Sequence, residues 1–453
     1  MTIHRSLGHV KECLKYMANS NNYNVLFLPG LPGDRKKYDI FVDVERSGGS
    51  ITWLTYTGTY ERSDFGAFSL QSCVVDIENG LLAMEEAGNP YLVVAYSFSS
   101  AALRLIDFSS YNLCAGVLLY SPIVGLEYAG SHGNFSSLLD YLQDSGVVNS
   151  LGDWSAYSEQ PSLHQWLTHM NAHCIPTAVF VGADDETRLP EDMIQTIAKD
   201  ISENAPYIQL IEVPTASHKI NSYHSTVARW YLWAFITKIL LGQTLTGNHA
   251  YYLWGSMLSH ATWTAHSDID ILIIGDISSS DYGAIAALAE QIEDLSGIHL
   301  GMSINSPTDL CRDQYIRRNR GAVFLRELKT HAMPLGGAIA VREVSDNEVI
   351  VDALNTNRIL RAEIAKQLLG YHRQKPVAKS IVKSYIQAVR LAQYAKHGKA
   401  SYDIALAQDG ETGQLLRRCI EAKHNNYATL GFDDLYALHV SIDQLIKEQE
   451  RTL

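Results

Sequence analysis

Over its first 245 residues the chain alternates short apolar runs with amphipathic stretches. The apolar runs are NVLFLPG, SITWLTYTG, YLVVAYS, AGVLLYSP, TAVFVGA and IQLIEVP, and LQSCVVDIENGLLAMEEAG is one of the amphipathic stretches between them. Each apolar run has the length and composition of a buried strand. Strands that alternate with helices form a mostly parallel sheet covered by helices on both faces. The pattern therefore predicts an α/β domain over residues 1–245.

Two further segments follow. Residues 246–345 restart the strand–helix pattern, with strands at YYLWG, IDILIIG and IHLGMSIN and a helix at YGAIAALAEQIEDLSG, which predicts a small α+β domain. Residues 346–453 turn helical, with Gly and Pro between the helices and few β-branched runs. We expect a helical bundle in this last segment.

Charge and cysteine content limit the classes of function. The net charge of −13 and the pI near 5.7 disfavour a general nucleic-acid binder and favour small-molecule substrates. The six cysteines are scattered without a CxxC pair, which indicates reduced thiols in a cytoplasmic protein. The N-terminus lacks the apolar core of a signal peptide, and no apolar run is long enough for a membrane span. We expect neither a membrane nor a nucleic-acid partner, and the oligomeric state stays open.

A nucleophile elbow is predicted at Ser97, in VVAYSFSSAALRLIDF. There a buried strand meets a helix in a sharp turn that lifts the serine hydroxyl away from the backbone. Such a turn needs small residues two positions before and after the serine, usually glycines. Here Ala95 and Ser99 hold those positions, so both glycines of the usual pattern are replaced by other small residues.

Partners for the serine follow along the chain. VFVGADDETRLPEDM offers Asp185, or Asp184, as the acid, and EVPTASHKI offers His218 as the base, with His224 as an alternative. A histidine oriented by a carboxylate makes a serine nucleophilic.

Taken together, these residues resemble the α/β-hydrolase family over roughly residues 20–245. The resemblance implies oxyanion amides from Leu31 and Phe98, with Pro29 where many relatives carry histidine, and it favours Asp185 as the acid. The loop YTGTYERSDFGAFS looks like one that many esterases carry after the second strand. The A-x-S-x-S elbow is also similar to acyl-carrier-protein thioesterases of bacterial bioluminescence. That likeness favours acyl esters or thioesters, including acyl groups bound to a carrier protein, over peptides.

A second candidate site lies in YYLWGSMLSHATWTAHSDIDILII. Asp268 and Asp270 are separated by one residue, so on a strand they point to the same face and can hold a divalent ion together. Gly255 and Ser256 form a turn that leaves room and backbone N–H groups for a phosphate. A metal ion beside a triphosphate cradle is the core of nucleotidyl transfer.

This order of motifs resembles the nucleotidyltransferase superfamily related to polymerase β and to antibiotic-modifying nucleotidyltransferases. The resemblance implies Mg²⁺ or Mn²⁺ at Asp268 and Asp270, and an NTP donor, ATP first among them, held by Gly255 and Ser256. Relatives hold two ions with three carboxylates, and the third comes from a later strand. The strand expected at IHLGMSINSP contains no acid, and His299 stands in that place, with Glu293 and Asp294 before it and Asp309 after it.

Two groups of basic residues near the second candidate site each have two interpretations. Lys379 and Lys383 share a helix face and either approach the triphosphate, as lysines from packed helices do in relatives, or lie on the surface. RDQYIRRNR, with Arg312, Arg317, Arg318 and Arg320, either neutralises phosphates or forms a solvated face, which is the better fit.

Four functions are consistent with these motifs. The first is a bifunctional enzyme that joins a serine esterase or thioesterase to a nucleotidyltransferase acting on a small molecule, as in natural-product biosynthesis. The second is an antibiotic-modifying nucleotidyltransferase with an accessory hydrolase domain. The third is a non-catalytic protein that binds a nucleotide and an acyl metabolite, and the fourth is a toxin-like transferase that acts on tRNA or protein.

Overall fold

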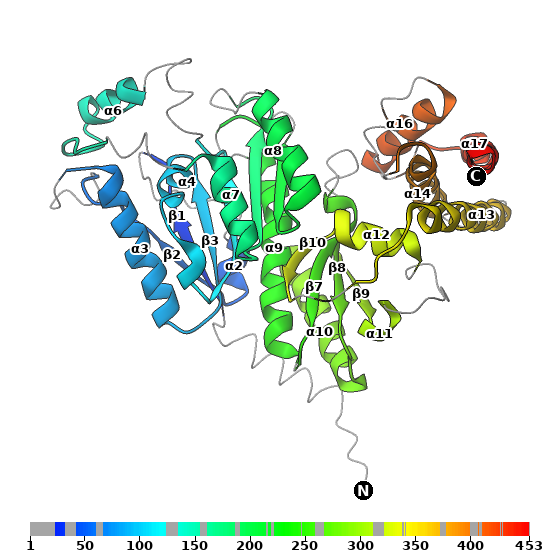
Figure 1. Ribbon diagram of the computed structural model, residues 1–453, viewed down its shortest axis with the longest axis horizontal. Helices are drawn as coiled ribbons and strands as arrows, with labels where there is room; N and C mark the ends of the chain where they lie inside the picture. The colour runs from blue at the N-terminus through cyan, green and yellow to red at the C-terminus, as the bar shows by residue number, and fades with distance from the viewer. Residues whose placement is uncertain are drawn as a thin grey trace, which may run out of the picture. The chain divides into compact units, whose positions relative to one another are not determined.

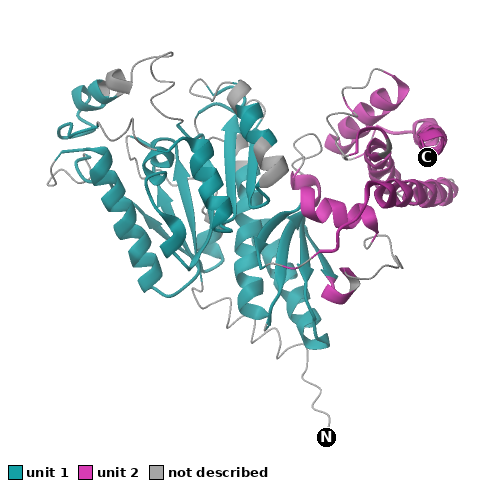
Figure 2. Ribbon diagram, in the orientation of Figure 1, with its two compact units in different colours: residues 1–254, 268–304, 332–338 teal, residues 255–267, 305–331, 339–453 magenta. Residues whose placement is uncertain are grey.

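The computed structural model divides the described part of the chain into two compact units (Figure 2). Unit 1 comprises residues 1–254, 268–304 and 332–338, and unit 2 comprises residues 255–267, 305–331 and 339–453. The structure describes residues 23–31, 42–59, 67–123, 135–154, 161–185, 191–213, 216–218, 222–245, 247–258, 267–310, 321–337, 339, 341–371, 377–398, 406, 410–425, 427 and 429–452.

A six-stranded parallel sheet forms the first half of unit 1 (Figure 1). Its order is β2-β1-β3-β4-β5-β6, and every neighbouring pair is parallel. The strands are β1 (Asn24–Leu28), β2 (Ser50–Trp53), β3 (Tyr91–Tyr96), β4 (Cys114–Tyr120), β5 (Thr177–Gly182) and β6 (Ile208–Val213). Each strand falls on one of the six apolar runs, so the predicted parallel sheet is confirmed.

Helices connect these strands: α2 (Val42–Arg46), α3 (Leu70–Glu86), α4 (Phe98–Leu103), η3 (Phe108–Ser110), α6 (Phe135–Asp144), α7 (Leu163–Ala172) and α8 (Glu191–Asn204). Helix α3 begins at a capping box between Ser69 and Ser72. It buries residues at helical spacing, including Leu70, Cys73, Ile77 and Leu81, in the same core as the odd-numbered residues of β3 and β4. The sheet and helices fit the α/β-hydrolase expectation for this region.

Helix α9 (Ser222–Thr244) contacts both halves of unit 1. Its Phe235 lies so close to Gly116 of β4 that a Cβ there would approach the ring to 2.1 Å. At the other side, the Arg229 guanidinium donates to the Ser296 carbonyl at 2.6 Å. Because both sides of the helix are covered, it is apolar around much of its circumference, with Tyr231, Trp233 and other side chains fully buried.

The second half of unit 1 is a four-stranded sheet in the order β10-β7-β8-β9. Its strands are β7 (Ala250–Trp254), β8 (Ile269–Ile274), β9 (Leu300–Asn305) and β10 (Met333–Gly336), and β7 is antiparallel to β8 and β10. Helix α10 (Ser279–Ser296) begins at a capping box on Ser278 and ends at Gly297, whose φ is +68°. The three predicted strands and the helix are confirmed, whereas β10 adds a fourth strand that the sequence pattern did not reveal.

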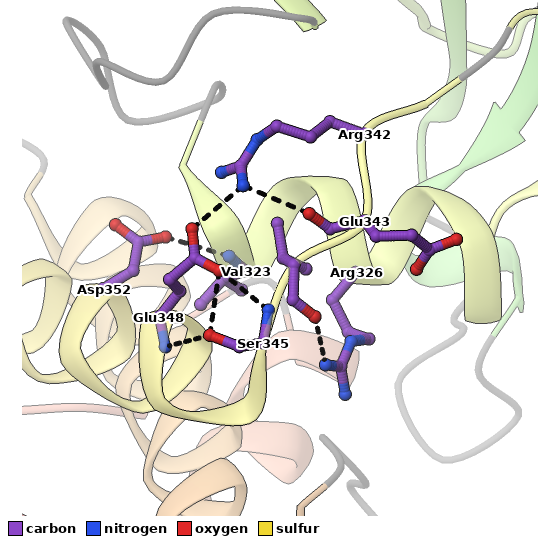
Figure 3. Close-up of polar contacts among 8 residues, drawn as sticks. Val323, Arg326, Arg342, Glu343, Ser345, Glu348 and Asp352 are labelled. Atoms are coloured by element: carbon purple, nitrogen blue, oxygen red, sulfur yellow. Dashed lines mark hydrogen bonds and ion pairs between the residues drawn. The ribbon is translucent and has the colours of Figure 1, made fainter.

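Unit 2 is helical. It contains η5 (Gly255–Leu258), α11 (Pro307–Leu310), α12 (Ala322–Thr330), α13 (Asp346–Tyr371), α14 (Ala378–His397), α16 (Glu411–His424) and α17 (Phe432–Thr452). Ser345 and Glu348 cap α13 reciprocally, and Asp352 of this helix accepts from the Val323 amide of α12 (Figure 3). The helical character predicted from residue 346 onward is thus confirmed.

The segment predicted at residues 246–345 contributes to both units, and the three-domain division stays a prediction. Among the described residues, no helix combines the length and apolar character that crossing a membrane requires. The arginine cluster of residues 312–320 lies outside the described residues.

Candidate active site

Ser97 stands between β3 and α4 in a strained turn. Its φ of 52° and ψ of −117° lie in a region that non-glycine residues rarely adopt. Its amide continues the sheet by donating to Tyr120 of β4 at 2.9 Å, and its carbonyl accepts from the Ser100 hydroxyl at 2.6 Å. The backbone thus folds back sharply at this serine, as the elbow pattern predicts.

A hydrogen-bonded chain connects Ser97, His218 and Asp185. Ser97 Oγ lies 2.8 Å from His218 Nε2, and His218 Nδ1 lies 3.1 Å from Asp185 Oδ2. An ionised carboxylate can only accept, so Nδ1 carries the proton and Nε2 is free to accept the serine hydroxyl hydrogen. Asp185 is 7% exposed and Ser97 is 6% exposed, whereas Asp184 is exposed to solvent. Of the two candidate acids, only Asp185 contacts the histidine.

Backbone hydrogen bonds join the loop that carries Asp185 to the loop that carries His218. The Ala183 amide donates to Val213, the last residue of β6, at 2.9 Å, and the Asp184 amide donates to Ala216 at 3.0 Å. These bonds align the segment after β5 with the segment after β6. Tyr96, the residue before Ser97, also holds His218 in place. Its hydroxyl donates to the His218 carbonyl at 2.9 Å, and its ring centroid lies 5.7 Å from that of the imidazole.

His224, the alternative base, belongs to α9, and its side chain lies outside the described part of the structure.

The loop after β1 approaches the elbow closely. A Cβ at Gly30 would come within 3.1 Å of Ser97 Cβ and 2.9 Å of Tyr96 Cδ1, so only glycine fits without displacement. Leu31 follows Gly30, and the Phe98 amide is the first of α4, where an N–H has no acceptor within its own helix. The predicted oxyanion amides of Leu31 and Phe98 therefore belong to segments next to the nucleophile.

Ser99 holds this loop in place, a role that sequence reasoning missed. Its hydroxyl donates to the Pro29 carbonyl and also contacts the Tyr56 hydroxyl. Because the single hydroxyl hydrogen of Ser99 goes to Pro29, Tyr56 must donate to Ser99. Burial raises the pKa of Tyr56 well above its ordinary value, so that donor stays protonated. The position that usually carries glycine thus supplies a hydrogen bond here.

Aromatic side chains surround the residue after the nucleophile. The ring of Phe98 lies 5.8 Å from Phe68, 5.9 Å from Trp154 and 6.1 Å from Tyr56, measured between centroids. Phe98, Phe68 and Tyr56 are each at most 1% exposed, so these rings belong to the hydrophobic core and hold the start of α4 in place.

The described residues do not complete the second candidate site. Asp270 lies on β8 opposite Trp254 of β7, and Asp268 immediately precedes the strand; both side chains are half-buried. The neighbouring strand β9 carries Gly301 beside Asp270, and a Cβ there would lie 2.5 Å from Asp270 Oδ1. His299 Nδ1 lies 2.7 Å from a Glu293 carboxylate oxygen.

No described Asp, Glu, His or Cys completes a three-ligand group with Asp268 or Asp270. The carboxylate pair alone does not fit the two-ion centre of the superfamily, which needs three carboxylates.

Gly255 and Ser256 belong to unit 2, whereas Asp268 and Asp270 belong to unit 1. Their mutual geometry therefore stays a prediction. Gly255 has a φ of +85°, as the predicted turn requires. Lys379 and Lys383 both lie exposed on α14.

Lys423 of α16 is a lysine that the sequence pattern did not single out. Its Nζ lies 3.4 Å from the Oγ of Ser267, the residue before Asp268, which is a long hydrogen bond. No motif marks Lys423, because its nearness to Ser267 depends on a contact across 156 positions of the chain.

No protein-family model matches the chain, and no curated protein matches it significantly. Among solved structures, about half of the chain is similar to a carboxylesterase from Nitrososphaera gargenis, at 12% identity, with 48% of this chain and 91% of the other covered and a TM-score of 0.35. An esterase from Thermogutta terrifontis matches at 16% identity, with 48% and 90% covered and a TM-score of 0.34. An esterase from Pyrococcus furiosus matches at 14% identity, with 49% and 83% covered and a TM-score of 0.35.

Proposed function

We propose that the α/β-hydrolase-like region is a serine hydrolase, or an acyl-transferring enzyme, that acts on acyl esters or thioesters. One observation carries this proposal: Ser97 Oγ lies 2.8 Å from His218 Nε2 while Asp185 binds the opposite ring nitrogen at 3.1 Å. That arrangement activates a hydroxyl for attack on a carbonyl carbon. The resemblance of the motif around Ser97 to esterase and thioesterase elbows favours an acyl group as the substrate, either on a small molecule or on a carrier protein.

The geometry supports acylation followed by deacylation. As Ser97 Oγ attacks the acyl carbon, His218 Nε2 accepts the hydroxyl proton, and the carbonyl oxygen becomes an oxyanion that accepts from the Leu31 and Phe98 amides. The imidazolium then gives its proton to the departing alcohol or thiol, which leaves the acyl group on Ser97. Water, or an acceptor alcohol, repeats the sequence and frees the serine. Asp185 stabilises the imidazolium and keeps its proton on Nδ1.

A fluorophosphonate probe tests this proposal. We expect the probe to label the wild-type protein on Ser97, and Ser97→Ala to abolish both the labelling and the hydrolysis of medium-chain p-nitrophenyl esters and acyl thioesters. The ratio of thioester to ester turnover then assigns the leaving group. Labelling that persists in Ser97→Ala, or an unlabelled wild type that is folded, would contradict the assignment.

A second candidate function is nucleotidyl transfer by the segment around Asp268 and Asp270, which would make the protein bifunctional. It is favoured by the pairing of Asp270 with Trp254, which directly precedes the Gly255-Ser256 turn in the chain. No described residue supplies the third carboxylate, so we derive no metal-dependent step. Without that step, binding of ATP or another NTP remains the testable part of the hypothesis.

Thermal unfolding with each of four NTPs, with and without Mg²⁺ or Mn²⁺, tests the second candidate. Protection by one NTP that disappears in Asp268→Asn/Asp270→Asn would support a nucleotide site. Unchanged melting with every NTP would exclude both the transferase and the nucleotide-binding hypotheses.

A further inference from the structure

Three potential metal ligands come together in unit 1, none of which belongs to the triad. Asp107, His169 and His173 each present one ligand atom, and these atoms all lie within 4.8 Å of one another. It is the only group of this kind among the described residues. The carboxylate comes from the segment after α4, whereas His169 lies in the last turn of α7 and His173 is the C-cap residue of that helix.

The two histidines are spaced for chelation. They are four positions apart, which places them on the same face of the helix, and their ring centroids are 4.4 Å apart. Helix α7 is anchored by a capping box at Ser162 and by four buried side chains on its other face, namely Leu163, Trp166, Leu167 and Met170. The imidazoles therefore project from a backbone that is already ordered.

Asp107 is also held in place. It caps η3, where its Oδ1 accepts from the Ser109 amide at 2.9 Å. A carboxylate has about four lone-pair positions on two oxygens. The cap therefore leaves acceptor capacity for a cation.

One ring nitrogen lacks a hydrogen bond. His169 Nε2 is shielded from solvent, has no hydrogen-bond partner among the described residues, and lies 3.3 Å from Asp107 Oδ1. Two ligands of a tetrahedral zinc ion with bonds of about 2.0–2.1 Å lie about 3.3–3.4 Å apart. The separation of these two atoms thus matches one edge of such a site.

We propose that Asp107, His169 and His173 bind a divalent late first-row transition metal ion, with zinc the best fit and water completing the coordination. Two imidazoles with one carboxylate disfavour Mg²⁺ and Ca²⁺, which prefer oxygen ligands. Such an ion would cross-link the segment that follows α4 to the end of α7. Helix α4 begins directly after Ser97, and α7 leads into β5. The proposal is independent of the proposed hydrolase activity.

Metal titration of the untagged, chelator-treated protein tests the proposal. We expect one equivalent of Zn²⁺ to compete with a chromophoric chelator, and one equivalent of Co²⁺ to give the visible absorption of a four-coordinate site. His173→Ala, at an exposed position, should weaken Zn²⁺ binding by about tenfold or more, since even loss of an outer-shell partner costs about 10–100-fold. Asp107→Asn, which keeps the capping oxygen, should weaken it similarly.

Two controls separate this site from other histidines. His164→Ala removes a histidine from the same helix and should leave the affinity unchanged, and His218→Ala removes the triad imidazole and should leave the stoichiometry at one. Zinc binding that survives His169→Ala/His173→Ala, or that disappears in His218→Ala, would overturn the proposal. So would a wild type that binds no zinc.

Discussion

At the scale of single residues, the two adjacent aspartates after β5 offer a matched test of the triad. Asp185 is buried and contacts His218, whereas Asp184 is exposed. Asp185→Asn should lower kcat by roughly 10⁴-fold, because the amide no longer fixes the histidine proton on Nδ1. Asp184→Asn should leave kcat unchanged. Ester hydrolysis by the two variants, at equal stability, checks this, and equal rates would remove Asp185 from the mechanism.

The Ser99 hydroxyl offers a second residue-scale prediction. Ser99→Ala leaves the Pro29 carbonyl and the Tyr56 hydroxyl without this partner in a buried setting, which costs about 1–3 kcal/mol. The same change loosens the Leu31 loop, so we expect kcat to fall by about tenfold or more. Tyr56→Phe is the control, because it keeps the bond from Ser99 to Pro29 and should retain most of the activity. Denaturant unfolding and ester kinetics measure both effects, and a greater loss of kcat in Tyr56→Phe than in Ser99→Ala would contradict this role.

The sequence could predict the three triad residues and their order, but not the hydrogen bonds that hold the neighbouring loop in place. Ser97, Asp185 and His218 each follow an apolar run, and in a parallel sheet the residues after such strands gather at one edge. Tyr56 and Ser99 are 43 positions apart in the chain, so no local sequence pattern predicts their contact. The same holds for Asp107 with His169, since a surface aspartate and a helical histidine are ordinary on their own.

At the scale of elements, the turn between β3 and α4 stores strain that two inactive variants can reveal. The φ of 52° and ψ of −117° at Ser97 suit glycine, and a non-glycine residue there costs roughly 1–3 kcal/mol. Ser97→Ala keeps the strain and Ser97→Gly relieves it, while glycine itself costs about 0.5–1 kcal/mol of unfolded-state entropy. We expect Ser97→Gly to be the more stable of the two by about 1 kcal/mol in urea unfolding. If Ser97→Gly were less stable than Ser97→Ala, the backbone at residue 97 would not be strained.

Strands and helices were predictable to the extent that their patterns were long. The six apolar runs and the C-terminal helices have the composition and period of the elements they form. Strand β10 escaped prediction because it has four residues, includes Pro334, and pairs with β7 at the edge of the sheet. Proline is tolerated at such edges, where one side of the strand needs no donor.

At the scale of the whole molecule, the predicted boundary after residue 245 does not coincide with the division into compact units. Helix α9 ends at Thr244, next to that boundary, yet it contacts strands of both sheets in unit 1. The sequence pattern predicts the helix, but it does not show which sheets pack against the helix. The same limit applies to β10, which returns to β7 after 78 intervening residues (Trp254 to Met333).

The acid stability of the folded chain provides the last prediction. Glu348 accepts from the Ser345 amide and hydroxyl, each at 2.8 Å, and from Arg342 at 2.9 Å (Figure 3). The Ser345 hydrogen bonds, followed by that from Arg342, lower the pKa of Glu348 to about 2 from its ordinary value of 4.5. A depressed folded-state pKa stabilises the protein above the unfolded-state pKa, and this contribution disappears as the pH falls from about 4.5 to about 2.

Glu348→Gln removes the charge and should therefore lower Tm near neutral pH, with a deficit that shrinks as the pH falls through this window. Glu363→Gln, on the same helix, shows the effect of losing one negative charge elsewhere on a chain of net charge −13. The measurement is Tm against pH for the wild type and both variants. A deficit in Glu348→Gln that stays constant from pH 7 to below about pH 3 would show that the amide fails for steric reasons, and that the carboxylate's charge does not stabilise the start of α13.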